Sequence, residues 1–277
     1  MLKVKGALMM HLKSVYFKKN EEDYFPYQLP FFGHKFSFSS PVTLIVGDNG
    51  SGKSTFLELI HAVIGLYKIN HRRRPFEALT RHIEEAKKDV KCVYHLNKPK
   101  GFYFSAEDFT SYIHDLVQEK NDSYLEIKRI DEEYADKSDF AKALAKMPHM
   151  KTITEINELY QHDLLTSSHG EAYLDFFKSR LHDHELYLLD EPETPLSIQN
   201  QFALLALIDK GVKQHNQFII STHSPILMAI PYAEILLITN EGMKKTSYED
   251  IESVALLKKF MQHPESFFKY LYENDEK

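Results

Sequence analysis

The sequence predicts an α/β fold in which a mostly parallel sheet is covered by helices on both faces. Runs of consecutive apolar residues are typical of strands that are buried on both sides. Three such runs are 42–46 (VTLIV), 186–189 (LYLL) and 218–220 (FII). Segments with helical periodicity alternate with these runs at 53–66, 171–181 and 197–210. This alternation indicates a doubly wound domain.

Further strands and an inserted lobe complete the predicted order. Stretches rich in β-branched and aromatic residues predict strands at 9–17, 35–38, 90–94, 102–104 and 235–238. The charged middle of the chain, 67–165, predicts a mainly helical lobe inserted between the core segments 1–66 and 166–277.

Prolines 75, 99 and 148 are expected to interrupt the helices of this lobe. Its longest helix is therefore expected within 122–147. One or two amphipathic helices are expected after Tyr248.

The composition excludes several classes of protein. The 277 residues include 34 Lys and Arg and 40 Asp and Glu, and the net charge of −6 argues against a surface coated for nucleic acid. No apolar run approaches the roughly 18 residues of a membrane span, and the N-terminus lacks a signal-peptide layout. The single cysteine, Cys92, cannot form an internal disulfide. We therefore expect a cytoplasmic protein without a membrane partner.

Glycine is scarce in this chain and clustered at one place. The ten glycines compare with roughly 19 at an average usage of about 7%, and three of them fall within six residues. That segment matches the phosphate-binding motif G-x-x-x-x-G-K-[ST], between an apolar strand and a helical pattern. It comprises Gly47, Asp48, Asn49, Gly50, Ser51, Gly52, Lys53 and Ser54. The motif predicts that the chain binds a nucleoside triphosphate.

The parts of this loop have distinct chemical roles. Its glycines let backbone N–H groups surround phosphate oxygens, and the start of the following helix adds the positive end of its dipole. Lys53, a candidate catalytic residue, is predicted to reach the β- and γ-phosphates. Ser54 is predicted to bind Mg²⁺, and Thr55 to contact the α-phosphate.

Two later strands end in residues that suit hydrolysis. Asp190 follows an apolar strand and is predicted to hold Mg²⁺, while Glu191 is predicted to activate the attacking water as a general base. His223 follows the next strand along the chain. At the carboxyl end of a parallel sheet it can hydrogen-bond the γ-phosphate.

Four segments together resemble ATPase heads of the ABC type. They are GDNGSGKST at 47–55, SSHGE at 167–171, LYLLDEPETPLS at 186–197 and FIISTHSPIL at 218–227. Their order and spacing are most similar to those of small stand-alone bacterial AAA family ATPases, relatives of the SMC and RecF heads. The resemblance implies a P-loop NTPase core, ATP and Mg²⁺ as ligands, and hydrolysis of ATP to ADP and phosphate.

The resemblance also implies a composite site between two subunits. Ser168 and Gly170 match the signature motif, which contacts the γ-phosphate bound by the other subunit of a head-to-tail dimer. Residues 194–197 match the D-loop, and His223 matches the switch histidine. Ser168 lies only 115 positions after Lys53, so long coiled-coil arms are not expected.

Some features of such heads have no clear match. Glu107, in FSAED at 104–108, is the candidate for the Q-loop position. The aromatic residue that stacks on adenine is unassigned among Tyr16, Tyr24, Phe25 and Tyr27, which leaves the choice between ATP and GTP open.

Two polar clusters admit more than one interpretation. The basic cluster at 71–74 (HRRR) is either a DNA contact or a solvated loop. The histidines at 182 and 184 are interpreted as part of a loop, because two ligands so close together suit a metal poorly.

Several functions compete with an ATP-driven switch. A nucleotide-binding subunit of an ABC transporter would use the same core, and a P-loop kinase would transfer phosphate to an acceptor other than water. A fused nuclease is not expected, because only 54 of the 277 residues follow His223. By analogy, the dimer acts on DNA or beside a separate effector protein such as a nuclease.

Overall fold

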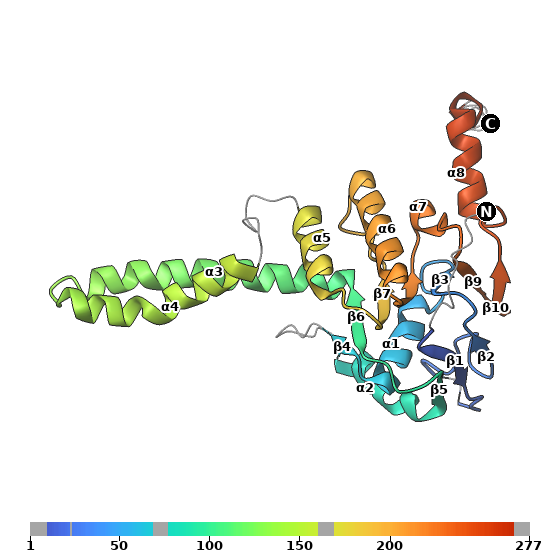
Figure 1. Ribbon diagram of the computed structural model, residues 1–277, viewed down its shortest axis with the longest axis horizontal. Helices are drawn as coiled ribbons and strands as arrows, with labels where there is room; N and C mark the ends of the chain where they lie inside the picture. The colour runs from blue at the N-terminus through green and yellow to red at the C-terminus, as the bar shows by residue number, and fades with distance from the viewer. Residues whose placement is uncertain (1–9, 23, 69–76, 160–168, 269–277) are drawn as a thin grey trace, which may run out of the picture.

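A seven-stranded sheet forms the centre of the molecule (Figure 1). The computed structural model describes residues 10–22, 24–68, 77–159 and 169–268. Across the sheet the strands run in the order β10 (Gly242–Thr246), β9 (Glu234–Thr239), β3 (Val42–Val46), β8 (Gln217–Ser221), β7 (Leu186–Asp190), β6 (Gly101–Ser105) and β4 (Tyr67–Lys68). Neighbours from β9 to β4 are parallel, and β10 is an antiparallel edge strand. The predicted α/β class is confirmed.

A helical hairpin projects from this core (Figure 1). Its helices are α3 (Ala106–Glu133) and α4 (Asp139–Leu159). At 1.5 Å per residue, the 28 residues of α3 extend about 42 Å. The chain thus carries a short arm.

The hairpin corrects two expectations about this region. A single long helix within 122–147 is wrong, because the chain reverses between the two helices and the Ser138 hydroxyl caps α4 by accepting from Ala141 N at 3.3 Å. An interruption at Pro148 is also wrong, since α4 continues to Leu159. Proline removes one backbone hydrogen bond from the helix, and packing of α4 against α3 compensates for this loss.

The region 67–165 is not mainly helical throughout, because strands occupy part of its first 40 residues. Strands β4 and β6 lie in the main sheet, and β5 (Val90–Tyr94) lies in a second sheet. Both β5 and β6 coincide with predicted strands. β4 and β10 were not predicted, because β4 has two residues and β10 (GMKKT) has only one large apolar side chain.

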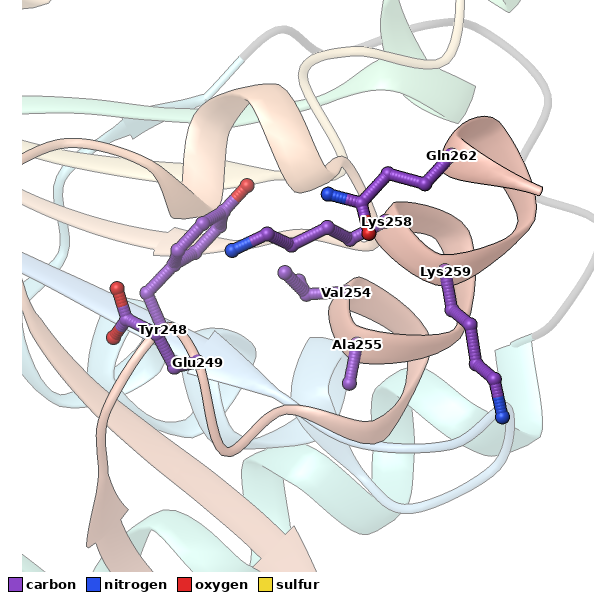
Figure 2. Close-up of a pocket in the computed structure, with 7 residues that line it drawn as sticks. All are labelled: Tyr248, Glu249, Val254, Ala255, Lys258, Lys259 and Gln262. Carbon is purple, nitrogen blue, oxygen red and sulfur yellow. The ribbon is translucent and has the colours of Figure 1, made fainter.

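Helix α8 (Glu252–Gln262) extends away from the sheet (Figure 1). A cavity of about 190 Å³ lies between its side and the loop at 248–249. Figure 2 shows the side chains that line this cavity: Tyr248, Glu249, Val254, Ala255, Lys258, Lys259 and Gln262. Among the described helices, none combines the length and the hydrophobicity needed to cross a membrane.

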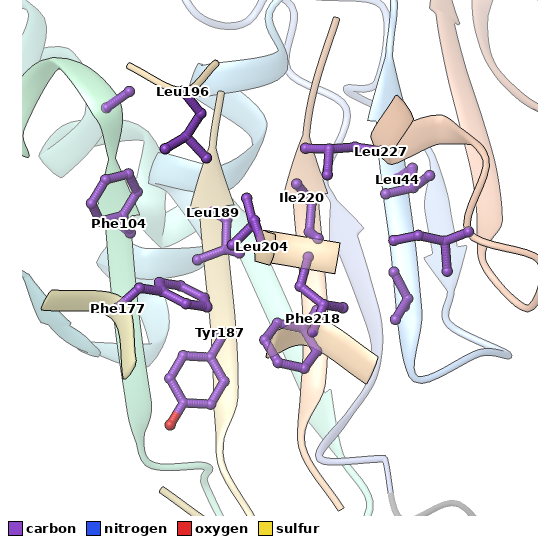
Figure 3. Close-up of a cluster of buried hydrophobic side chains, with 14 of the residues drawn as sticks. Leu44, Phe104, Phe177, Tyr187, Leu189, Leu196, Leu204, Phe218, Ile220 and Leu227 are labelled. Atoms are coloured by element: carbon purple, nitrogen blue, oxygen red, sulfur yellow. The ribbon is translucent and has the colours of Figure 1, made fainter. Parts of the chain in front are cut away.

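Helices α5 (His169–Arg180), α6 (Ile198–Lys213) and the short α7 (Pro225–Met228) cover one face of the sheet. Residues at the base of α3 and α4, and one residue of α8, belong to the same buried cluster. Figure 3 shows Leu189, Phe218 and Ile220 of the sheet facing Phe177 of α5 and Leu204 of α6. Burial of these side chains fixes the rotation of each central strand, because a shift of one residue would turn them to the opposite face.

The other face is covered by α1 (Lys53–Ile64) and a small antiparallel sheet. That sheet has the order β2 (Lys35–Ser37), β1 (Leu12–Phe17) and β5. Phe17 of β1 and Phe56 of α1 pack with ring centroids 5.0 Å apart, in the same buried cluster as Ile45 and Ile219 of the main sheet. Both faces of the central strands are therefore buried from solvent, as their apolar runs predict.

Candidate functional site

Strand order brings three loops of the chain together. β8 lies between β3 and β7, so the residues that follow these three strands meet at one edge of the sheet. Ser221, the last residue of β8, is level with Ile45 on one side and with Asp190 on the other. The carboxyl edge of a parallel sheet is where such folds bind ligands.

The phosphate loop leads directly from β3 into α1. Gly50 and Gly52 have φ angles of 78° and 96°, a left-handed region that favours glycine. Replacement of Gly52 would also be crowded, because its Cβ would lie 2.9 Å from Leu29 Cδ2. The loop therefore keeps its backbone N–H groups close to the N-terminus of α1, an arrangement that suits phosphate oxygens.

Lys53 lies inside this loop. Its Nζ donates to the carbonyl oxygens of Gly47 at 3.1 Å and Asp48 at 3.0 Å. Burial lowers the pKa of Lys53, while Glu191 and Asp190 act in the opposite direction. The ammonium group is thus largely desolvated, and an anionic phosphate would complement it.

Ser54 and Asp190 provide a pair of oxygen ligands that fits Mg²⁺. Ser54 Oγ donates to Asp190 Oδ1 at 3.1 Å, and the buried Ser221 hydroxyl donates to the same oxygen. Burial raises the pKa of Asp190 to about 6, although both hydroxyl contacts act to lower it. Mg²⁺ is usually held by one or two protein oxygens together with substrate phosphates and water, and this pair meets that requirement.

Glu191 and His223 face each other beside this pair. His223 Nε2 lies 3.5 Å from Glu191 Oε1, and both side chains are about 40% exposed. Glu191 has a φ of 47°, and its N–H donates to Ser221 O at 3.0 Å. A non-glycine residue in this conformation is strained, and such strain is concentrated at functional sites.

The structure describes one of the two residues predicted for the partner-facing half of the site. Ser168 is outside the described residues. Gly170 is in the first turn of α5, where an added Cβ would lie 2.5 Å from Asn200 Nδ2 and 3.4 Å from Pro195 O. The start of α5 therefore packs closely on the first turn of α6 and on the segment that precedes it.

The structure describes Glu107 but not the basic cluster. Glu107 is an exposed residue in the first turn of α3, after the strand that neighbours β7. The cluster at 71–74 lies outside the described residues.

The aromatic candidates for adenine differ in their surroundings. The Tyr27 ring is buried and its hydroxyl donates to Asp89 at 2.9 Å, which commits this side chain to the core. Tyr16 and Tyr24 are partly exposed. Leu29 and Phe31 lie beside the phosphate loop, each with an atom within 3.2 Å of a Cβ placed on Gly52.

Sequence reasoning missed three polar residues at this edge. Ser221 bonds to Asp190, while Glu193 and Gln201 hold the loop that carries His223. Glu193 stands inside the recognisable DEPE segment. Ser221 stands inside the segment FIISTHSPIL, but its contact with Asp190 depends on strand order. No local pattern marks Gln201, whose contact depends on the rotation of α6.

Several solved structures are similar to this chain. An SMC head domain with an extended coiled coil, bound to the C-terminal domain of ScpA and derived from Pyrococcus furiosus, has 15% identity and a TM-score of 0.44, and the match covers 91% of this chain and 99% of that one. An SMC head domain from Thermotoga maritima has 19% identity, coverage of 86% and 99%, and a TM-score of 0.42. An ATP-binding cassette of an ABC transporter in its ADP conformation has 18% identity, coverage of 85% and 90%, and a TM-score of 0.45.

A family model accounts for most of the chain. No curated protein matches the sequence. The model of the RecF/RecN/SMC N-terminal domain matches residues 33–245, a range that spans the phosphate loop, the acidic pair and His223. The predicted relation to SMC and RecF heads is confirmed: this chain belongs to the RecF/RecN/SMC N-terminal domain family.

Proposed function

We propose that this chain is an ATP-hydrolysing molecular switch, in which ATP binding joins two copies head to tail and hydrolysis releases them. One observation carries the proposal. Lys53 and Ser54 meet Asp190, Glu191 and His223 at a single sheet edge, with Ser54 Oγ 3.1 Å from Asp190 Oδ1. A single substrate could therefore contact a lysine for its phosphates, a pair of oxygen ligands for a metal ion and a carboxylate that can act as a general base.

The chemistry assigns a role to each group. Lys53 binds the β- and γ-phosphates, and Ser54 with Asp190 would hold Mg²⁺, which neutralises charge on those phosphates when bound. Glu191 accepts a proton from water as the water oxygen bonds to the γ-phosphorus and the bond to the ADP oxygen breaks. His223 hydrogen-bonds the transferring phosphoryl group.

The second subunit would complete this site. Ser168 and Gly170, at the start of α5, are proposed to contact the γ-phosphate bound by the partner, where the N-terminal end of the helix favours an anion. Residues 194–197 would cross between the subunits. The contact between Gly170 and this segment would couple the two sites.

Closure of the dimer would move a bound partner, and family membership supports a role with DNA or a separate effector protein. The hairpin of α3 and α4, whose helices pack on each other, would transmit the motion. Family membership also favours an ATP-driven switch over a nucleotide-binding subunit of a transporter. Co-purification with a membrane protein would reverse that preference.

Steady-state phosphate release from Mg-ATP, with and without DNA, tests the proposal. We expect turnover by the wild-type chain and a loss of about 10²-fold or more in Glu191→Gln, with ATP affinity kept within about threefold. The matched control is Glu249→Gln, because Glu249 is an exposed carboxylate away from the sheet edge. Transfer of the labelled phosphate to an acceptor, or full turnover by Glu191→Gln, would contradict the proposal.

A further inference from the structure

Glu193 binds the loop after β8 through one oxygen atom. Its Oε1 accepts from Thr222 Oγ1 at 2.7 Å, from His223 N at 2.7 Å and from Ser224 N at 3.1 Å. These donors come from three consecutive residues centred on His223. A carboxylate that accepts several such bonds holds a loop more strongly than neutral contacts do.

The same loop is held from its other side by α6. Ser224 Oγ donates to Gln201 Oε1 at 2.7 Å, and Gln201 Nε2 donates to Leu196 O at 3.3 Å. Glu193 and Leu196 both belong to the segment between β7 and α6. The segment that begins with Glu191 therefore determines where the backbone of His223 lies.

Glu193 is poorly placed to act as a base or a metal ligand itself. Its Oε1 is occupied by the three donors, and its Oε2 is buried with no hydrogen-bond partner among the described residues. The buried hydroxyl of Tyr173 on α5 is also without a partner among them. Burial, assisted by the charge of Glu193, raises the pKa of this hydroxyl. Because Oε2 is itself buried, it is not open to substrate water.

We infer that Glu193 is a positioning residue that holds His223 against Glu191 and the γ-phosphate. Its side chain fixes the backbone N–H of His223, and the imidazole then lies 3.5 Å from the Glu191 carboxylate. The inference rests on the proposed function for the role of His223. The mechanical part of the inference is that the Glu193 carboxylate holds the loop at 222–224, and this part does not depend on that function.

Amide hydrogen exchange of the nucleotide-free chain tests the mechanical part. In Glu193→Ala the amides of His223 and Ser224 lose their acceptor, and we expect them to exchange about tenfold faster or more. In Glu193→Gln the amide oxygen still accepts, so protection should be largely restored. Glu249→Ala is the control for loss of a carboxylate. Unchanged exchange in Glu193→Ala would overturn the inference whether or not the chain hydrolyses ATP.

A double-mutant cycle tests the link to His223. We expect Glu193→Ala to lower kcat about tenfold or more with a small change in KM, and to have little further effect in a His223→Ala background. An equal loss in both backgrounds would overturn the positioning role. If Glu193→Ala does not fold, Glu193→Asp, whose shorter side chain retracts the carboxylate from the loop, takes its place in both experiments. Absence of turnover in the wild type would contradict the proposed function instead, and the exchange result would still decide the inference.

Discussion

At the scale of single residues, Asp190 combines a proposed metal-binding role with an unfavourable environment for its charge. The residue is 8% exposed and its carboxylate accepts from two hydroxyl groups, yet burial raises its pKa from 3.8 to about 6. The ionised form is therefore less favourable in the folded chain than in the unfolded one. Above about pH 6 this difference lowers the free energy of unfolding, and below about pH 3.8 it disappears.

Asp190→Asn is accordingly expected to stabilise the chain without nucleotide or metal. At pH 7.5 the free energy of unfolding should rise by about 1–3 kcal/mol, because the desolvated charge is removed while an oxygen remains for Ser54 and Ser221. At pH 5 the gain should be smaller. Urea denaturation at both pH values measures this, and a variant less stable than the wild type at pH 7.5 would show that the ionised carboxylate is stabilised by its neighbours.

The same scale shows what sequence could and could not predict about the site. Motifs predict the residues that directly follow an apolar strand. These are the loop at 47–54, the pair Asp190 and Glu191, and the segment that contains His223. Ser221 and Gln201 depend on which strands are neighbours and on how α6 is rotated. Such contacts between distant segments leave no local pattern.

At the scale of elements, helical propensity predicts that the region of α3 and α4 is helical, but it does not predict that the chain forms a hairpin there. Propensity predicts helix throughout 122–147 but does not locate the reversal, which depends on the Ser138 cap and on packing between the two helices. The base of α4 enters the main core through Ile156, which is 4% exposed in the same cluster as Phe109 and Ile113 of α3. Near the tip, Phe140 is 78% exposed.

Truncation at these two positions should therefore have different effects. Ile156→Ala is expected to lower the free energy of unfolding by about 2–4 kcal/mol, because it leaves a cavity in the core. Phe140→Ala should change it by less than about 0.5 kcal/mol. Chemical denaturation of the two variants measures both values. Equal losses would mean that the exposed side of α4 is packed in solution.

At the scale of the whole molecule, the sheet separates two buried clusters and gathers the site at its carboxyl edge. Apolar runs predicted this layering because strands covered on both faces need no alternation. They did not predict the separate sheet of β1, β2 and β5, whose strands come from distant parts of the chain. One subunit contributes Lys53, Asp190, Glu191 and His223, and in the proposed switch a second subunit contributes the start of α5.

Light scattering of Glu191→Gln with saturating Mg-ATP tests this central claim most directly. Loss of the general base should leave ATP bound and unhydrolysed, so the dimer should accumulate at twice the monomer mass of 32.4 kDa. The same variant without nucleotide should be monomeric, and Lys53→Ala should stay monomeric with ATP. A Glu191→Gln variant that remains monomeric at saturating Mg-ATP would contradict the head-to-tail switch.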